Sequence, residues 1–391
     1  MARRFTDARE LLRDLLNRHE AGTTKPIAHP DYAAFPSVVK ADAFAKELAL
    51  AEESGAVAIA RGRGAREGEI LHVRLKAPHV LYELLQRTPI TRIADDASSR
   101  LIEGLSLHTG LLEAVSDIAA TWSRARAWSG YGPEDVVRLR SALSLAQAVL
   151  DGRHMGVDYR TFSRRVAGDS KALEKAEGAV VRLLSGVLDL PSGARPRDAL
   201  RTLGLERFAP PLLIAAQMDL KGADLSKTSL AYLGLPPNET RWILFRSKPL
   251  YVLTIENFAS FNRHITEADP SRLGATIYVG GYPSLATQDA LRQIAEMLPD
   301  DVPFFHWSDI DPDGTWIFRT IERAVRRPLQ AHLMSVEIAE EHGRPQMTRT
   351  VPRPCSDDSE IAPLVRYFSR PDAKTLEQEE LDPRLPPFGI K

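Results

Sequence analysis

The sequence of 391 residues contains a single cysteine, Cys355. One thiol excludes a disulfide framework and a zinc site built from thiolates, and it is typical of a protein in a reducing cytosol. No apolar run approaches the roughly 20 residues that cross a bilayer. The first residues read as a charged, amphipathic helix and lack the apolar core of a signal peptide. We therefore expect a soluble, cytoplasmic protein with no membrane contact.

The chain also lacks an excess of charge of either sign. Lys and Arg number 51 and Asp and Glu number 52, so the net charge is −1. Nucleic-acid binding through bulk charge is thereby excluded, and any such binding must rest on local basic patches. Hydrophobic residues at 43% and charged residues at 26% are ordinary for globular proteins. The length allows about two to four domains.

The N-terminal region has the pattern of a winged helix. The expected elements are helices at 5–20 and 39–53, a Pro-rich linker at 26–36, and strands at 56–59 and 70–75. The two strands flank a Gly-rich tip with Arg61, Arg63 and Arg66. Helices followed by such a hairpin are typical of a DNA-binding domain whose arginines contact phosphates. We predict that this winged-helix domain spans residues 1–90. The alternative is that the hairpin tip is simply exposed to solvent, where Gly and Arg are common, and does not contact DNA.

The middle of the chain is predicted to be helical. Residues 91–152 are expected to form a helical arm, because apolar residues recur every three or four positions near its end. Residues 153–236 are expected to form a central helical, winged-helix-like domain, with a corner at Gly168. The basic residues that we expect to contact DNA here are Arg160, Arg164, Arg165 and Lys171. A solvated charged helix face is the alternative.

The last domain, placed at residues 237–391, alternates strand and helix patterns. Strands are expected at 250–256, 276–279, 302–309 and 331–336, and helices at 258–265, 285–298 and 316–325. Such alternation predicts a four-stranded parallel sheet covered on both faces. The fold class is therefore multidomain, combining α+β and α/β parts.

Acidic residues close two of these expected strands. Glu256 ends the first strand, and Asp309, Asp311 and Asp313 alternate at the end of the third, just before Gly314. The carboxyl edge of an open parallel sheet is where ligands bind. Carboxylates so close together raise one another's pKa unless a cation neutralises them. Oxygen ligands without a cysteine or histidine cluster favour one or two Mg²⁺ or Mn²⁺ ions.

Three other interpretations of the acidic loop have weaker support. A calcium EF-hand requires Glu at the twelfth loop position, where this chain has Thr320. A haloacid-dehalogenase-type phosphatase requires a later Lys, and none lies between Thr315 and Asp357. The plainest alternative is a solvated Asp-rich turn that caps a helix. An acid at the matching end of another strand, Glu256, favours the metal site.

Four stretches of the sequence resemble the JetD family of bacterial Wadjet anti-plasmid systems. They are Thr254-Ile255-Glu256-Asn257, Gly280-Gly281-Tyr282-Pro283, residues 308–314 and Leu376-Glu377-Gln378-Glu379. The resemblance implies a relative of the topoisomerase VI A subunit, with a Toprim nuclease domain joined to winged-helix-like modules. It also implies a homodimer that cuts circular double-stranded DNA. The implied partner is an SMC motor complex with kleisin and winged-helix accessory subunits.

This resemblance implies a metal-dependent endonuclease with Glu256, Asp309 and Asp311 as catalytic residues and metal ligands. Asp313, nearer to the next helix, is expected to be an outer ligand or a helix cap. Residues 374–381 are expected to form a helix, from which Glu377, or else Glu379, completes a second metal site.

The chain departs from the topoisomerase relatives in one respect. Those enzymes cleave through a tyrosine in an Arg-x-x-Tyr-Tyr context, and neither Tyr159 nor Tyr232 lies in that context. We therefore expect water to be the nucleophile. The alternatives are tyrosine-dependent strand cleavage and a non-catalytic DNA-binding or scaffold subunit.

Overall fold

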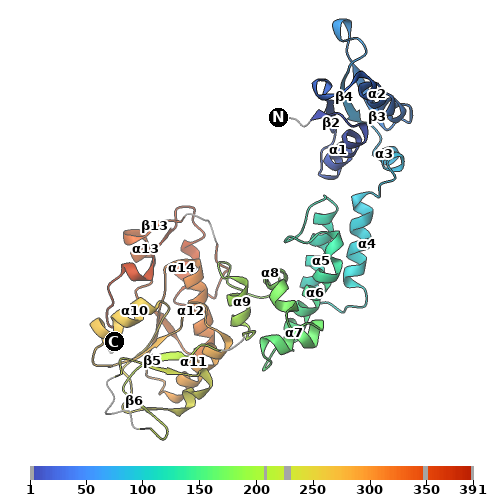
Figure 1. The fold of residues 1–391 in the computed structure, drawn as a ribbon. Helices are drawn as coiled ribbons and strands as arrows, with labels where there is room; N and C mark the ends of the chain where they lie inside the picture. Colours follow the sequence, from blue (N-terminus) through green and yellow to red (C-terminus); the bar gives the residue numbers. More distant parts are fainter. Residues whose placement is uncertain (1–3, 207–208, 224–229, 347–350, 389–391) are drawn as a thin grey trace. The chain divides into compact units, whose positions relative to one another are not determined.

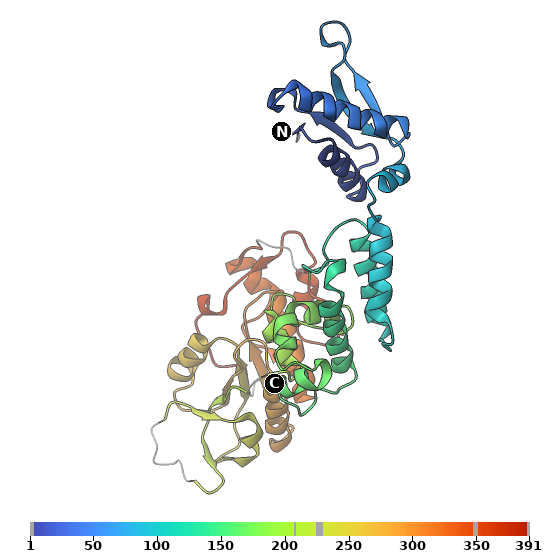
Figure 2. The same ribbon diagram turned by 45° about the vertical axis from the view of Figure 1, so that its right-hand side comes forward.

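The structure is a computed structural model that describes residues 4–206, 209–223, 230–346 and 351–388. The chain folds as two compact units, residues 1–147 and 148–391 (Figure 1 and Figure 2). Helices and several sheets occur in it, so it is a multidomain protein of mixed α/β structure. Among the described helices, none combines the length and apolar character needed to cross a bilayer.

The first unit begins with a four-stranded sheet and its helices. The elements are β1 (Arg4–Phe5), α1 (Ala8–Glu20), β2 (Ile27–Pro30), α2 (Val38–Glu53), β3 (Val57–Arg61), β4 (Ile70–Leu75) and α3 (Pro78–Leu84). The strand order is β1-β2-β4-β3, and β3 and β4 form the expected antiparallel hairpin. The hairpin tip projects from this domain in both views. The Pro-rich stretch expected to be a linker contains β2, because its backbone pairs with β4.

Amphipathic spacing explains the helix at the centre of this domain. Asp7 caps α1 by accepting a hydrogen bond from the backbone N–H of Glu10 at 2.7 Å. Four leucines of α1 are buried: Leu11, Leu12, Leu15 and Leu16. They pack in one core with residues of the sheet and of α2, such as Val73 and Leu48. The predicted helices and hairpin are therefore confirmed, with shifts of up to three residues at their ends.

Helices follow the sheet, as the middle of the sequence predicted. They are α4 (Ile90–Ile102), α5 (Thr109–Trp122) and α6 (Val136–Leu150), and the boundary between the two units falls within α6. The second unit begins with α7 (Tyr159–Ala167), α8 (Ala172–Ser185) and α9 (Pro196–Thr202). Gly168 ends α7 with a left-handed backbone at φ 76°, so the predicted corner is confirmed.

A six-stranded sheet forms the centre of the second unit. Its strands are β5 (Leu212–Ala215), β7 (Leu233–Leu235), β9 (Val252–Ile255), β10 (Ala275–Tyr278), β11 (Phe304–Trp307) and β12 (Leu329–Ala331). Their order is β12-β11-β9-β10-β5-β7. The four strands expected to be parallel are parallel, and β5 and β7 extend the sheet by antiparallel pairing. The sheet is therefore larger than the four-stranded sheet predicted from the sequence.

The remaining elements cover or flank this sheet. They are β6 (Met218–Leu220), β8 (Ile243–Phe245), α10 (Phe258–Arg263), α11 (Leu285–Met297), α12 (Pro312–Val325), α13 (Val336–His342), β13 (Arg344–Pro345), α14 (Ala362–Tyr367) and β14 (Lys374–Thr375). Two predicted boundaries were wrong. The fourth parallel strand ends at Ala331, because Ser335 caps α13. Helix α12 begins at Pro312, because Asp311 caps it and proline suits a first helical turn.

The strand order creates a crevice between β9 and β11. The chain moves from β9 to β10 on one side, and then back past β9 to β11 and β12. Because parallel crossovers are right-handed, this reversal puts α10 on one face and α11 and α12 on the other (Figure 1). The helices that follow β9 and β11 therefore diverge. Such a switch point is where open α/β sheets bind ligands.

The first turn of α12 packs unusually close to the loop that follows β11. A Cβ atom on Gly314 would lie 2.0 Å from the carbonyl oxygen of Asp309 and 2.9 Å from Oγ of Ser308. The loop and the helix therefore approach each other as closely as they do because residue 314 has no side chain.

We predict that Gly314→Ala lowers the free energy of unfolding by roughly 1–3 kcal/mol, because the added methyl group forces the loop and α12 apart. The matched control is Gly178→Ala in α8, where a Cβ meets no atom within 4 Å. That change should raise stability by about 0.8–1 kcal/mol, the difference in helix propensity. Urea unfolding of the full chain measures both. A Gly314→Ala protein as stable as the wild type would contradict the close approach.

Candidate functional site

Glu256 and Asp309 lie together at the switch point. Glu256 directly follows β9, and Asp309 lies two residues beyond the end of β11. The backbone N–H of Asp309 donates a hydrogen bond to Oε2 of Glu256 at 3.3 Å. Gly281, in the loop after β10, faces Glu256, since a Cβ there would lie 4.0 Å from Oε1. The first two acids singled out in the sequence are thus brought together.

Asp311 and Asp313 have different surroundings. Asp311 is the N-cap of α12, and its Oδ1 accepts a hydrogen bond from the backbone N–H of Gly314 at 2.6 Å. The side chain of Asp313 accepts a hydrogen bond from the backbone N–H of Gly193 at 3.3 Å. Burial, with the negative charge of Asp313, raises the pKa of Tyr282. The capping role considered for Asp313 therefore belongs to Asp311. Asp313 joins α12 to the chain that precedes the sheet.

The C-terminal acidic segment is not the helix that the sequence suggested. Residues 374–381 form the short strand β14 followed by a 3₁₀ turn at Gln378–Glu380. An antiparallel bridge fixes this course, because the N–H of Ile310 donates to the carbonyl of Leu376 at 2.9 Å and the reverse bond is 3.0 Å long. Leu376 is 3% exposed, so the segment is anchored in the core.

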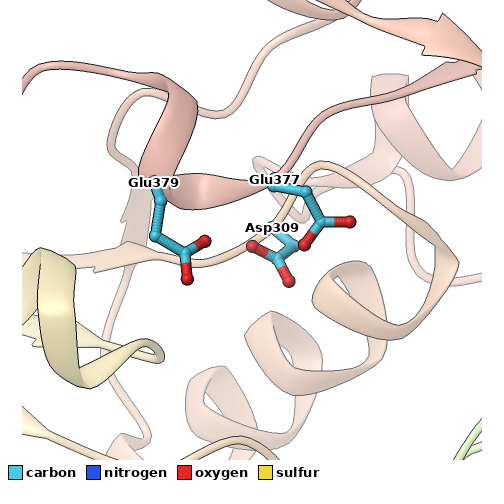
Figure 3. A group of neighbouring side chains, drawn as sticks. All are labelled: Asp309, Glu377 and Glu379. Carbon is cyan, nitrogen blue, oxygen red and sulfur yellow. The ribbon is translucent and has the colours of Figure 1, made fainter.

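This extended course places two further carboxylates beside Asp309. Carboxylate oxygens of Asp309, Glu377 and Glu379 all lie within 4.8 Å of one another. Figure 3 shows the two glutamates on either side of Asp309, with the three carboxylates facing one another. On a helix only one of the two glutamates would have faced the site. Glu377 and Glu379 therefore both join the cluster, not one or the other.

The acids at the switch point have raised pKa values. Burial, with the negative charges of Asp309 and Asp311, raises the pKa of Glu256 to about 8. Burial also raises the pKa of Asp309 to about 7, despite a hydrogen bond from the N–H of Gln378. Burial raises the pKa of Asp311 to about 6, despite the hydrogen bond from the N–H of Gly314. Desolvation and like charge thus act together against ionisation.

No basic side chain offsets this charge within the described residues. In those residues, no salt bridge involves Glu256, Asp309, Asp311, Glu377 or Glu379. The neighbouring Glu380, by contrast, pairs with Arg344 at 2.9 Å. Glu256, Asp309 and Asp311 are half-buried, and Glu377 and Glu379 are exposed. A group of oxygen ligands that repel one another and lack their own cation fits a hard divalent ion such as Mg²⁺ or Mn²⁺. The residues present therefore suit the metal that the sequence suggested.

The basic residues singled out in the sequence lie on other elements. Arg61, Arg63 and Arg66 are exposed on the β3–β4 hairpin of the first unit. Arg61 forms an ion pair of 2.5 Å with Glu52. In the second unit, the exposed residues Arg160, Arg164 and Arg165 lie on α7, and Lys171 precedes α8. Within the second unit, none of these basic side chains belongs to the acid cluster, by which we mean Glu256, Asp309, Asp311, Glu377 and Glu379.

Two residues of the site were missed in the sequence. Gln378 bonds the ends of β9 and β11. Tyr282 lies close enough to Asp313 that the negative charge of Asp313 helps to raise its pKa. Both lie inside the quoted Leu-Glu-Gln-Glu and Gly-Gly-Tyr-Pro stretches. The only signal for Gln378 in the sequence was an uncharged residue between two acids. Hydrophobic periodicity does not indicate that a side chain bonds the ends of two strands.

Comparison with known proteins places the likeness in the sheet-bearing part of the chain. Residues 211–385 match the family model described as "Wadjet protein JetD, C-terminal". A curated protein, "Wadjet protein JetD" of Bacillus cereus (strain Q1), is 25% identical over 199 residues. That alignment covers 48% of this chain and 46% of the relative, so the chain matches about half of the relative's length.

We predict that, in EDTA, the chain loses stability as the pH rises from 6 to 8. A carboxyl group whose pKa is higher in the folded than in the unfolded chain stabilises the fold while protonated. That stabilisation is lost as the pH rises through the folded pKa. For Glu256, with an ordinary value of 4.5 and a folded value of about 8, the loss between these pH values is about 2 kcal/mol.

Urea unfolding at the two pH values measures this loss. In Glu256→Gln, which cannot ionise, the dependence on pH should be smaller by about that amount. Glu380→Gln, which removes an exposed acid of the same segment, should keep the wild-type dependence. Equal dependence in the wild type and Glu256→Gln would show that Glu256 does not titrate in this range.

Proposed function

We propose that this chain is a JetD-type protein and a metal-dependent DNA endonuclease of a Wadjet defence system. The match of residues 211–385 to the JetD family model and the 25% identity to a curated relative support this proposal. The observation that carries the proposal is the convergence of acids at the β9–β11 switch point. Acids at the ends of two adjacent parallel strands, Glu256 on one and an Asp-x-Asp on the other, match the carboxylate arrangement of a Toprim domain. The proposed reaction is hydrolysis of a phosphodiester bond in double-stranded DNA.

Each acid has a proposed part in this reaction. Asp309 and Asp311 are the proposed main ligands of one or two Mg²⁺ or Mn²⁺ ions, with Glu377 and Glu379 completing the site on the side of Asp309. The bound cation supplies positive charge that offsets charge on the scissile phosphate. Glu256, with its raised pKa, is suited to hold or move a proton near neutral pH, or to act as a further ligand. Asp313 is proposed to be an outer residue that orients α12.

Water is the proposed nucleophile. The hydroxyl of Tyr159 donates to a carboxylate oxygen of Glu177, and burial beside this carboxylate raises the pKa of Tyr159 far above its ordinary value. The ring of Tyr232 packs edge-on against Phe258 and Phe261. A tyrosine nucleophile must be exposed and easily deprotonated, and these surroundings favour neither.

DNA contact is proposed for the two basic surfaces outside the acid cluster. The order of helices and hairpin in residues 1–90 supports a winged helix, with Arg61, Arg63 and Arg66 at its wing. The α7–α8 corner, with Arg164, Arg165 and Lys171, supports a central winged-helix-like module. Phosphate contacts position a protein on DNA without reading its sequence. We therefore propose binding with little sequence preference.

A homodimer and a motor partner complete the proposal. A single site cuts one strand, and a two-fold pair of sites cuts both strands of a circular duplex. The name of the relative, Wadjet protein JetD, supports a role beside the other Wadjet subunits. We propose those subunits to be an SMC motor with kleisin and winged-helix accessory proteins. Circular plasmid DNA is the proposed substrate.

We predict that Glu256→Gln, Asp309→Asn and Asp311→Asn each slow plasmid cleavage in Mg²⁺ by about 10²–10⁴-fold, because each removes a charge at the reacting phosphate. DNA binding should change little. The matched control is Glu380→Gln, which removes an acid that pairs with Arg344. Gel analysis of supercoiled plasmid, with and without the motor subunits, measures cleavage. Wild-type rates in the three variants would refute the assignment of the site.

We predict that Arg164→Gln with Arg165→Gln weakens DNA binding and lowers the slope of log affinity against log salt by about 2, or one for each lost phosphate contact. The matched control is Arg197→Gln, since Arg197 already pairs with Glu177 at 3.0 Å. Fluorescence anisotropy with two unrelated duplexes at several salt concentrations measures both quantities. An unchanged slope would remove α7 from the proposed DNA surface.

We predict a molar mass in solution near twice the 43.3 kDa of one chain. Light scattering of the free and the DNA-bound protein measures it. The mass of a single chain in both states would contradict the homodimer. Cleavage of both DNA strands would then require something other than a two-fold pair of sites.

A further inference from the structure

The side chain of Gln378 fills the crevice between the ends of β9 and β11. Its Nε2 donates to the carbonyl of Trp307 at 2.9 Å, and its Oε1 accepts from the N–H of Asn257 at 2.8 Å. The last regular pair of these strands is Ile255 with Trp307. The amide of Gln378 therefore bonds both strand ends beyond this pair, as a peptide group would. The residue is 1% exposed.

The backbone of Gln378 is bound to the acid cluster itself. Its N–H donates to Oδ1 of Asp309 at 2.6 Å. Together with the Ile310–Leu376 bridge, these bonds fix the course of residues 376–378 against the end of β11. The residues before and after Gln378 are Glu377 and Glu379, whose carboxylates face Asp309 (Figure 3). The position of the buried Gln378 therefore determines how closely the carboxylates of Glu377 and Glu379 approach Asp309.

The acids need such a restraint because the segment has no regular structure of its own. It consists of a two-residue strand and a single 3₁₀ turn. Three carboxylates within 4.8 Å repel one another when no cation is bound. Asn257 provides a second restraint, since its Nδ2 donates to Oε1 of Glu379. Without Gln378, repulsion would move Glu377 and Glu379 away from Asp309.

We propose that Gln378 is a positioning residue, which sets the affinity of the acid cluster for a divalent cation by holding Glu377 and Glu379 against Asp309. The inference rests on the metal site of the proposed function. Gln378 itself donates and accepts hydrogen bonds only within the protein, and its side chain does not bind the cation. Residues that orient metal ligands typically change metal affinity by 10–100-fold when they are replaced.

Only a side chain with glutamine's length and amide group makes both bonds. Methionine has nearly the same shape but neither donates to Trp307 nor accepts strongly from Asn257. Asparagine keeps the amide but is one methylene shorter. Gln378→Met tests the loss of both bonds, and Gln378→Asn tests the loss of reach in a variant that keeps the polarity of the crevice.

The experiment measures Mn²⁺ binding to the full chain by electron paramagnetic resonance. Gln378→Met and Gln378→Asn should each raise the Kd for Mn²⁺ by about 10–100-fold. Glu380→Gln, the control on the same segment, should keep the wild-type Kd. Hydrogen exchange in EDTA supplies a readout that does not involve metal or activity. The amides of residues 376–380 should exchange faster in both variants, whereas those of β9 and β11 should keep their protection.

The outcomes separate this inference from the proposed nuclease activity. A folded Gln378→Met or Gln378→Asn protein with the wild-type Kd overturns the positioning role, whatever the wild type does to DNA. If Gln378→Met loses protection throughout the second unit, the comparison rests on Gln378→Asn. A wild type that binds Mn²⁺ without cutting DNA refutes the nuclease but leaves the positioning role in place. A wild type that binds no Mn²⁺ refutes both.

Discussion

Repulsion among carboxylates at the ends of β9 and β11 is the constraint on which the second unit depends. Backbone N–H groups bond three of these acids: Asp309 bonds Glu256, Gln378 bonds Asp309, and Gly314 bonds Asp311. Such donors bring partial charges but no net charge. The pKa values of all three acids therefore stay raised even with these bonds. The fold holds the acids together but leaves their charge to be neutralised by something else.

The chain topology explains why the acids meet at this edge and not elsewhere. Neighbouring parallel strands put the residues after their carboxyl ends side by side, and diverging helices leave the space above them open. Glu256 and Asp309 are separated by 53 residues, yet a backbone hydrogen bond joins them. The loop after β10 reaches the same edge of the sheet, where a Cβ on Gly281 would lie 4.0 Å from Oε1 of Glu256. Strand order therefore determines the composition of the site.

Local patterns in the sequence predicted the features that depend on neighbouring residues alone, namely the buried strands, the acids at their ends and the end of α7. Four apolar runs predicted the parallel strands, because strands buried on both faces are apolar throughout. Acids at the ends of two of these runs predicted a site at the carboxyl edge. The break at Gly168 was visible because glycine accommodates the left-handed backbone that ends α7.

The strands that the sequence did not predict share one cause, which is pairing between distant segments. The Leu-Glu-Gln-Glu stretch has good helix formers, but its bridge to Ile310, 66 residues away, holds it extended. The Pro-rich stretch became β2 because β4 offered a free edge, and Pro30 lies at the strand's last position. Likewise, β5 and β7 are short; β5 pairs with β10, and β7 pairs with β5. The intrinsic propensity of such a segment determines its secondary structure only where no distant strand is available to pair with it.

Contacts with residues before the sheet show that the surroundings of the site extend beyond residues 211–385, the part of the chain that matches the family model. Asp189 accepts a bond from Arg319 of α12 at 3.2 Å, and its carbonyl accepts from Nε1 of Trp316 at 3.2 Å. Arg319 is well buried there, with its side chain 13% exposed. Together with the bond from Gly193 to Asp313, these contacts join α12 to the segment that precedes the sheet.

The consequence concerns Asp311, which caps the same helix. A cap is fixed in space only if its helix is fixed. Helices α11 and α14 pack against α12, and the segment around Asp189 and Gly193 adds further bonds to it, although this segment precedes the matched residues 211–385. The sheet brings the acids together, and the preceding helical region fixes the helix from which one of them projects. The geometry of the acid cluster is therefore a property of the whole second unit, not of the sheet domain alone.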